Sequence, residues 1–346
     1  LTVNSINLFS GGAVSTDFKI TVDTTKAGSA SDTFVLPLQN TTNNFVVYWG
    51  DGTSETVTTV TSVTHVYASS GTYQISLDGS FDGIRFVGGG DRLKLSSIDN
   101  WGANQWKKLD YSFYVCTNVV GTYTDSPDTS LATGSAIGMF RDCANFNSPL
   151  TMDTSGINQM RWMFWGCTNF NSDVTFSDTS SVTDMDYMFY ACTNFDKAVN
   201  FNTASVTKIN HMFANCSSFN QTINFVSPLL TIINDAFNGC SSLNSPINID
   251  VSGCLNFVRT FYNCTVFDQD LSGWDISTLT SAANMLLGTA FSTTNYDLLL
   301  VAWQGQTHNN SVAFHAGTAQ YSSGAPATAR ASLVTDLWTI TDGGAV

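Results

Sequence analysis

A string of the form Met-Phe-x-x-Cys-x-x-Phe-Asn recurs through the middle of this sequence at a nearly constant interval. Its clearest copy runs from Met163 to Asn171, and related copies lie on both sides of it. From Cys143 to Cys264 the cysteines that belong to this string are 24, 25, 24, 24 and 24 residues apart. So regular a period indicates one supersecondary unit that is repeated along a solenoid of about seven coils.

Each repeat divides into two halves with different hydrophobic patterns. Between 182 and 192 the apolar residues have the spacing of one helical face, which predicts a short helix with a start capped by residues 178–180. Residues 173–176 alternate polar and apolar side chains, which predicts a short strand. One strand and one helix per coil is the plan of a leucine-rich repeat, so we expect an α+β solenoid.

The coils are expected to be stable only as a stack. A single coil offers few apolar side chains against the conformational entropy of about 24 ordered residues. Seven of the eight cysteines occupy one repeat position, and we expect them to form a buried row. Disulfides between neighbouring coils and a metal or redox site are the alternatives, although no CxxC pair is present.

The segments that flank the repeats have other patterns. Residues 18–86 contain short strand-like runs separated by Gly, Ser and Asn, which predicts a small β-sandwich. Residues 1–17 are expected to be an arm or linker, 87–290 the solenoid, and 291–346 a small α/β cap.

Two parts of the chain resemble known families. The runs Trp49-Gly50-Asp51-Gly52-Thr53, His65-Val66-Tyr67 and Gly71-Thr72-Tyr73 resemble a PKD-type (Ig-like) β-sandwich. The Met-Phe-x-x-Cys-x-x-Phe-Asn units resemble BspA-like surface leucine-rich repeats of the mycoplasma-lipoprotein type. The resemblance implies an exposed role in adhesion or recognition, outside the cell, on a cell surface or a virion.

Composition narrows the classes of function. Lys and Arg number 13 against 27 Asp and Glu, a net charge of −14, which makes nucleic acid a poor partner. The apolar runs are too short to enter a membrane as a span. No nucleophile, phosphate-loop or metal motif is present, so we expect no enzyme and no cofactor. Asp51 and Asp91 are the candidates for a calcium ion, with a turn role as the alternative.

The predicted strand side carries two polar rows that repeat from coil to coil. They are candidates for binding a glycan or a protein, and the alternative is that they keep this face soluble and in register. The first row comprises Thr151, Thr175, Asn200, Asn224, Asn248 and Ser272. The second row comprises Asn147, Asn171, Asp196, Asn220, Asn244 and Asp268.

The predicted helix side carries large aromatic residues opposite the apolar face. Trp162 and Trp165 on one coil and Tyr187 and Tyr190 on the next are candidates for a contact patch. Equivalent residues elsewhere are Tyr111, Tyr114 and Tyr262. The alternative is that the helix is distorted or that another part of the chain covers it.

These features favour a non-enzymatic adhesion or receptor-binding protein that presents its repeats to a cell-surface glycan or protein. The alternative is a structural component of a surface or virion, such as a phage spike, tail fibre, decoration protein or filament subunit that contacts neighbouring subunits.

Overall fold

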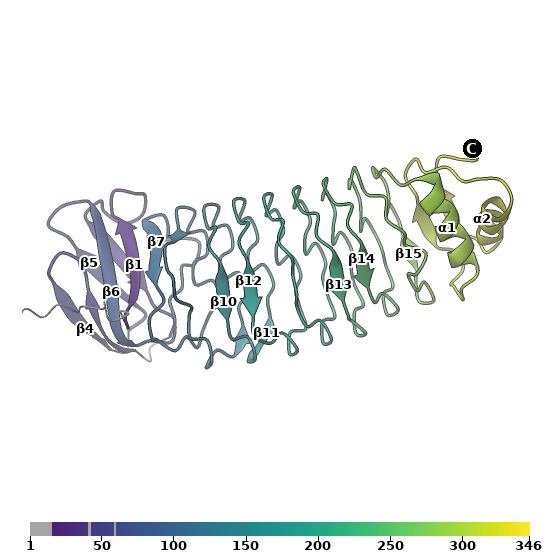
Figure 1. Cartoon of the computed structure of the whole chain (residues 1–346). Coiled ribbons are helices and arrows are strands. Elements are labelled where there is room, and N and C mark those ends of the chain that lie inside the picture. The colour runs from purple at the N-terminus through teal and green to yellow at the C-terminus, as the bar shows by residue number, and fades with distance from the viewer. Residues whose placement is uncertain (1–15, 41–42, 59) are drawn as a thin grey trace, which may run out of the picture.

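The computed structural model describes residues 16–40, 43–58 and 60–346. Of the segment expected to be an arm, 1–15 lies outside the described residues, whereas Thr16 and Asp17 lie against the first sheet. Ala103 donates its N–H to the Thr16 carbonyl, and Ser76 donates its hydroxyl to the Asp17 carboxylate. The described chain is an elongated stack of coils between a β unit and a helical end (Figure 1).

The N-terminal unit contains two sheets. A six-stranded sheet has the order β4-β3-β6-β1-β7-β8, and β2 pairs with β5 beside it. Their bounds are β1 (Phe18–Asp23), β2 (Thr33–Pro37), β3 (Asn44–Tyr48), β4 (Ser54–Thr58), β5 (Ser62–Val66), β6 (Thr72–Ser80), β7 (Leu95–Asn100) and β8 (Val120–Gly121). Strand β7 is antiparallel to β1 but parallel to β8, so the sheet passes directly into the first coil.

Short parallel strands and bridges connect the coils. Their bounds are β9 (Gly134–Ser135), β10 (Leu150–Met152), β11 (Ile157–Gln159), β12 (Val174–Phe176), β13 (Ile223–Phe225), β14 (Ile247–Ile249) and β15 (Ser281–Ala282). A ladder of single bridges links Gln159, Asp184, Lys208, Ile232, Asn256 and Ser281, one residue per coil. The chain therefore forms a β-solenoid of stacked coils, and the predicted repeat solenoid is confirmed.

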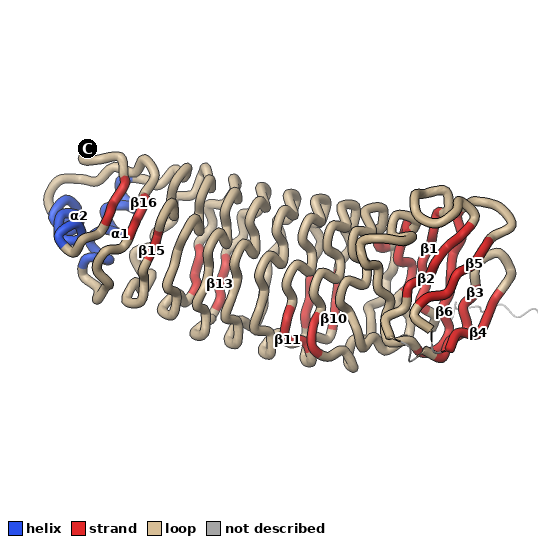
Figure 2. Tube along the Cα trace, turned by 180° about the vertical axis from the view of Figure 1, so that it is seen from behind, coloured by secondary structure: helices blue, strands red, loops and turns tan. Residues whose placement is uncertain are grey.

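The helix predicted in each coil is wrong. Among the described residues, helices occur only near the C-terminus, as Figure 2 shows. In the coil around Met188, alternate N–H groups donate in two directions. Those of Tyr187 and Phe189 donate to carbonyls of the next coil, 2.8 and 2.9 Å away, whereas that of Cys192 donates to Phe189 within its own coil. The α+β class is corrected accordingly to a mostly β fold with two helices.

The coil spacing explains the absence of helices. Strand-like neighbours lie about 4.8 Å apart, whereas a helix with its side chains is about 10 Å wide. A nearly straight stack at the β spacing, as in Figure 1, has no room for a helix on every coil, whereas a curved stack could hold helices on its wider outer side. The residues chosen from the helical pattern are nevertheless all buried: Val182, Met185, Met188, Phe189 and Cys192.

Stacked phenylalanines fill the core. Phe164, Phe189 and Phe213 lie one above another with ring centroids 5.4 and 5.6 Å apart and planes within 5°. The cysteines of the repeat position lie beside them, and the buried row expected for these seven residues is confirmed. All eight cysteines, Cys254 included, are free and buried. The thiol of Cys192 donates to the carbonyl of Phe164 in the preceding coil, 2.9 Å away. Neither disulfides nor exposed thiols contribute to the described solenoid.

The C-terminal end continues the ladder and then covers it. Strand β15 pairs in parallel with β16 (Ala313–His315), which pairs with β17 (Thr339–Thr341). Helix α1 (Thr293–Gln304) and helix α2 (Ala325–Thr335) pack beside these strands (Figure 1).

Buried polar groups hold the segment that precedes β7 against β2 and the loop before it. The Asp91 carboxylate accepts N–H groups of Ser29 and Val35, both at 2.6 Å. The fully buried Lys94 ammonium donates to the carbonyls of Ala30 and Thr33 at 2.8 and 2.6 Å. Asp91, one of the two residues considered for calcium, thus already holds internal donors.

Candidate functional site

A tight turn in each coil determines where the outer side chains lie. In the turn that begins at Trp162, this residue has a left-handed backbone (φ 59°), and the N–H of Trp165 donates to its carbonyl, 3.1 Å away. The same turn begins at Tyr187 (φ 58°) and ends at Tyr190. We call the two ends of this turn the first and second turn positions; residues between them, such as Phe164, belong to the core.

The two turn positions can be followed along the stack. The first turn positions hold Tyr111, Gly138, Trp162, Tyr187, His211, Asp235, Arg259 and Asn284, all with positive φ. The second turn positions hold Tyr114, Arg141, Trp165, Tyr190, Ala214, Asn238, Tyr262 and Leu287. The four aromatic residues singled out from the sequence therefore lie together on two adjacent turns.

These side chains form one continuous surface, which we call the aromatic surface. It comprises Tyr111, Tyr114, Arg141, Trp162, Trp165, Tyr187, Tyr190 and His211, all of them partly exposed. Its rings stack from coil to coil. Trp165 lies on Tyr187 with centroids 5.0 Å apart and on Tyr190 at 4.4 Å, and Tyr187 stacks on His211 at 4.4 Å.

Arg141 connects Tyr114 on the coil before it to the two tryptophans on the coil after it. Its guanidinium carbon lies 5.4 Å from the ring centre of Tyr114, 5.1 Å from Trp162 and 4.6 Å from Trp165. Arg161 packs over Trp162 at 4.7 Å. Cation–π contacts of this kind hold the rings in place.

Positive charge is concentrated here, yet it is balanced. The chain has six arginines, at 85, 92, 141, 161, 259 and 330. Arg141 faces Asp142 at 3.4 Å, Arg161 faces Asp184 at 3.6 Å, and Arg259 binds Asp235 at 2.8 Å. Each of these arginines thus has its own carboxylate, and the surface is rich in charge without a large excess of either sign.

The backbone at the first turn position is costly for bulky residues. A non-glycine residue in the left-handed region costs roughly 1–2 kcal/mol, and a large aromatic there is uncommon. Trp162 and Tyr187 occupy it nevertheless, although the coil before Trp162 places Gly138 at this position and a later coil places Asn284 there. The left-handed backbone belongs to every coil, so what sets these two coils apart is that a bulky aromatic residue occupies it.

The second polar row proves to be a structural ladder. Asn171 Oδ1 accepts the N–H of Asp196 at 2.9 Å, and Asp196 Oδ1 accepts that of Asn220, also at 2.9 Å. The same bond recurs from Asn147 to Ser292. Since one carboxylate or amide oxygen of each member is used internally, these residues connect successive coils.

The first polar row lies on the outside of the short strands. Thr151 and Thr175 are partners in the β10–β12 register, and Asn224 and Asn248 in β13–β14; all four, and Asn200, are exposed. The Asn248 amide donates to the Asn224 side chain at 2.7 Å. Some of the polar groups of this row therefore hydrogen-bond to one another instead of remaining free for a ligand.

A further ladder, unforeseen from the sequence, supports the aromatic surface. Asp186 accepts the N–H of Asn210 at 2.7 Å, and Asn210 accepts that of Asn234 at 3.2 Å. Burial raises the pKa of Asp186, and the nearby carboxylate of Asp184 adds to this rise. The one feature of the sequence that could have predicted this ladder is that Asp or Asn recurs immediately before the first turn position.

Past Tyr190 the surface opens into a hollow of about 400 Å³. His211, Asp235 and Arg259 line it together with Tyr190, Asn238 and Tyr262. Burial lowers the pKa of His211, while the hydrogen bond from Arg259 to Asp235 raises the pKa of the guanidinium. His211 Nδ1 and, on the aromatic surface, Trp162 Nε1 are buried atoms without a hydrogen-bond partner in the described chain.

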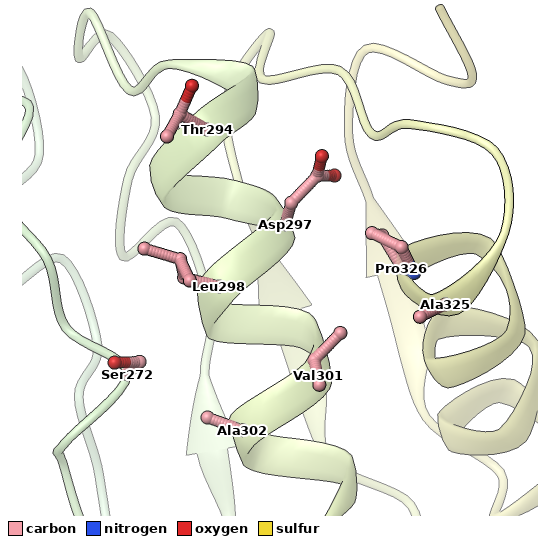
Figure 3. A pocket seen from close by; sticks show the side chains of 8 residues that line it. All are labelled: Ser272, Thr294, Asp297, Leu298, Val301, Ala302, Ala325 and Pro326. Carbon is pink, nitrogen blue, oxygen red and sulfur yellow. The ribbon is translucent and has the colours of Figure 1, made fainter.

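A second hollow, of about 590 Å³, lies between the two helices of the C-terminal end (Figure 3). Its wall is mainly apolar, with Leu298 and Val301 on α1 and Pro326 on α2. Asp297 accepts the N–H of Ser322 at 2.9 Å, so its carboxylate is already engaged. Few polar groups remain here to orient a ligand.

The described residues contain neither a metal-binding cluster nor a membrane-spanning helix. Three or more His, Cys, Asp or Glu side chains arranged to hold a metal ion do not occur there. Nor is any described helix long and apolar enough to cross a bilayer.

Comparison with known proteins identifies one family. No curated protein matches the chain, and neither does any solved structure. The family described as "Mycoplasma protein of unknown function, DUF285" matches residues 86–197, 134–227 and 226–322. These overlapping matches run from 86 to 322, about two thirds of the 346 residues. The chain therefore belongs to the DUF285 family of Mycoplasma proteins of unknown function.

Proposed function

We propose that this protein is a non-enzymatic binding protein of a cell or virion surface, acting outside the cell. Its aromatic surface contacts a cell-surface glycan or protein. In finer detail, we propose that the solenoid is related to BspA-like surface leucine-rich repeats and the N-terminal unit to PKD-type sandwiches.

One observation carries the proposal: folding does not require aromatic residues at the turn positions. The turns at Asp235–Asn238 and His211–Ala214 make the same internal hydrogen bond, 3.1 Å in both, as the turn at Trp162–Trp165. Aromatic side chains have therefore accumulated on adjacent turns where small or polar ones suffice. Exposed aromatic clusters usually mark contact sites.

The PKD-type relationship rests on the Trp-Gly-Asp-Gly turn between β3 and β4. Asp51 accepts the N–H of Thr53 at 2.9 Å and faces His65 Nε2 at 2.8 Å, while His65 stacks on Trp49 with centroids 4.7 Å apart. These contacts hold the turn between β3 and β4 against His65 of strand β5. Since Asp51 is engaged in this way, it supports the turn role over a calcium role.

The test replaces two tryptophans with residues that the same positions hold elsewhere. Trp162→Asn plus Trp165→Asn copies Asn284 and Asn238, and asparagine tolerates the left-handed backbone. We expect the melting temperature to fall by only a few degrees, while binding to intact cells in a flow-cytometry screen falls at least tenfold. Tyr48→Ser, at an exposed site of β3, is the control. Unchanged cell binding, or collapse of the fold, would contradict the proposal.

The structural alternative predicts a different outcome. A spike, fibre, decoration or filament subunit would self-associate, and mass photometry of the chain with and without residues 1–15 would detect it. A monomer in both forms that still binds cells supports the binding proposal.

A further inference from the structure

The aromatic surface changes character after Tyr190. The second turn positions of the next two coils hold small residues, Ala214 and Asn238, and the third holds Tyr262. With coils about 4.8 Å apart, Tyr190 and Tyr262 are separated by roughly 14 Å along the stack. The 400 Å³ hollow lies in this gap and is lined by both tyrosines.

The polar groups of the hollow are held in fixed positions. Arg259 donates from Nε and Nη2 to the two oxygens of Asp235, at 2.8 and 3.0 Å. Asn238 donates to Asp235 at 2.9 Å, and His211 Nε2 lies 3.5 Å from the same carboxylate. Asp235 is almost fully buried, whereas the Arg259 side chain is 48% exposed. The guanidinium therefore still presents donors to a ligand, in a fixed plane.

Charge points to a neutral ligand. Arg259 is neutralised by Asp235, as Arg141 and Arg161 are by their own carboxylates, and the whole chain carries −14. An anionic ligand would find no uncompensated positive charge and would be repelled at long range. Hydroxyl groups, in contrast, both donate and accept, and they match a site with guanidinium, imidazole and amide groups side by side.

We propose that this hollow is the binding site for one or two residues of a neutral pyranose sugar. Tyr190 and Tyr262 contact the apolar C–H faces, and Arg259, His211 and Asn238 hydrogen-bond the hydroxyls. The lining of the hollow is mostly polar, with the two tyrosines among its lining residues, so it offers both the ring surfaces and the hydrogen-bonding groups that a sugar needs. The inference deepens the proposed function and rests on it, since the sugar would belong to the contacted surface.

The experiment presents the full chain to an array of immobilised neutral, uronic-acid and sialylated oligosaccharides, followed by calorimetric titration of the best neutral binder. We expect neutral sugars to bind and acidic ones not to bind. Tyr262→Ser removes one wall, and Asn238→Tyr places at a second turn position that lines the hollow the residue that Tyr190 and Tyr262 supply on either side of it. Each should weaken binding at least tenfold, whereas Tyr48→Ser should leave it unchanged. If Asn238→Tyr does not fold, the binding measured for Tyr262→Ser decides.

The outcomes separate this inference from the proposed function. Binding to acidic sugars alone, or full binding by Tyr262→Ser, overturns the sugar site. Cell binding that depends on Trp162 and Trp165 but not on Tyr262 also overturns it and leaves the proposed function intact. An absence of cell binding in every variant and in the parent chain overturns both.

Discussion

At the scale of single residues, the cysteines show how one side chain can serve the same purpose in every coil. From Cys143 to Cys264, the thiol at the repeat position is small enough to lie beside the phenylalanine stack, and it donates to a phenylalanine carbonyl of the preceding coil. For Cys216 and Cys240 these donor–acceptor distances are 2.9 and 3.0 Å. Burial raises the pKa of the Cys254 thiol to about 12 and that of Cys264 to the same value. Such thiols are poor nucleophiles.

Thiol chemistry should therefore report directly on the coil interior. We expect no modification by a thiol-reactive dye at pH 8 in the native protein and modification of all eight cysteines in guanidinium chloride, since each is fully buried. Rapid native-state labelling of Cys192 or its equivalents, read by mass spectrometry, would contradict a buried row.

Asp51 gives the N-terminal unit an acid-sensitive contact. Burial tends to raise the pKa of Asp51, but hydrogen bonds from Thr53 and His65 outweigh this effect and lower it from 3.8 to about 2. Because the folded pKa lies below the unfolded one, the ionised carboxylate stabilises the fold above about pH 4, and this stabilisation is lost as the pH falls toward 2.

Asp51→Asn should therefore lower the melting temperature at pH 7, and the difference from the parent chain should shrink between pH 4 and pH 2. Calorimetry across this range measures it. Asp78→Asn, at an exposed position of β6, is the control and should have little effect. A difference that stays constant down to pH 2 would show that the carboxylate charge is not what stabilises the turn.

At the scale of elements, the sequence predicts which residues are buried better than it predicts their backbone. The spacing of Val182, Met185 and Met188 fits a helical face, yet Tyr187 and Ala191 have left-handed backbones, and no helix can form across them. Local periodicity reports only which side chains face inward. The backbone is decided by hydrogen bonds to neighbouring coils, which no single repeat reveals.

The side-chain ladder depends on an acceptor oxygen and not on charge. Asn147 Oδ1 accepts the Asn171 N–H at 2.8 Å and the Ser172 hydroxyl at 2.9 Å. Asn147→Leu removes this acceptor and should lower the free energy of unfolding by about 1 kcal/mol, as measured with guanidinium chloride. Asn147→Asp retains it, as Asp196 and Asp268 do elsewhere, and should be nearly neutral. Equal losses in both variants would contradict the ladder.

At the scale of the whole molecule, each coil supplies two outer turn positions to a common surface. The tryptophans and tyrosines could be recognised from the sequence because large aromatics opposite an apolar face stand out. The hollow could not, because His211, Asp235 and Arg259 look like ordinary variation at one repeat position. Their contacts join residues 24 apart, and only the stacking brings them together.

Removal of whole coils tests this organisation. Residues 193–240 make up two complete Cys-to-Cys periods, so their deletion joins Cys192 to Ser241 in the same register as Cys240 in the parent chain. Because stability in a solenoid is a sum over coils and their interfaces, the shortened chain should still unfold cooperatively at a somewhat lower denaturant concentration.

Small-angle X-ray scattering of this deletion variant tests the central claim, that equivalent coils stack with each coil one strand spacing from the next. The account predicts a folded particle whose maximum dimension is shorter by about 10 Å, two steps of roughly 4.8 Å. An unchanged maximum dimension, or an unfolded chain, would contradict it.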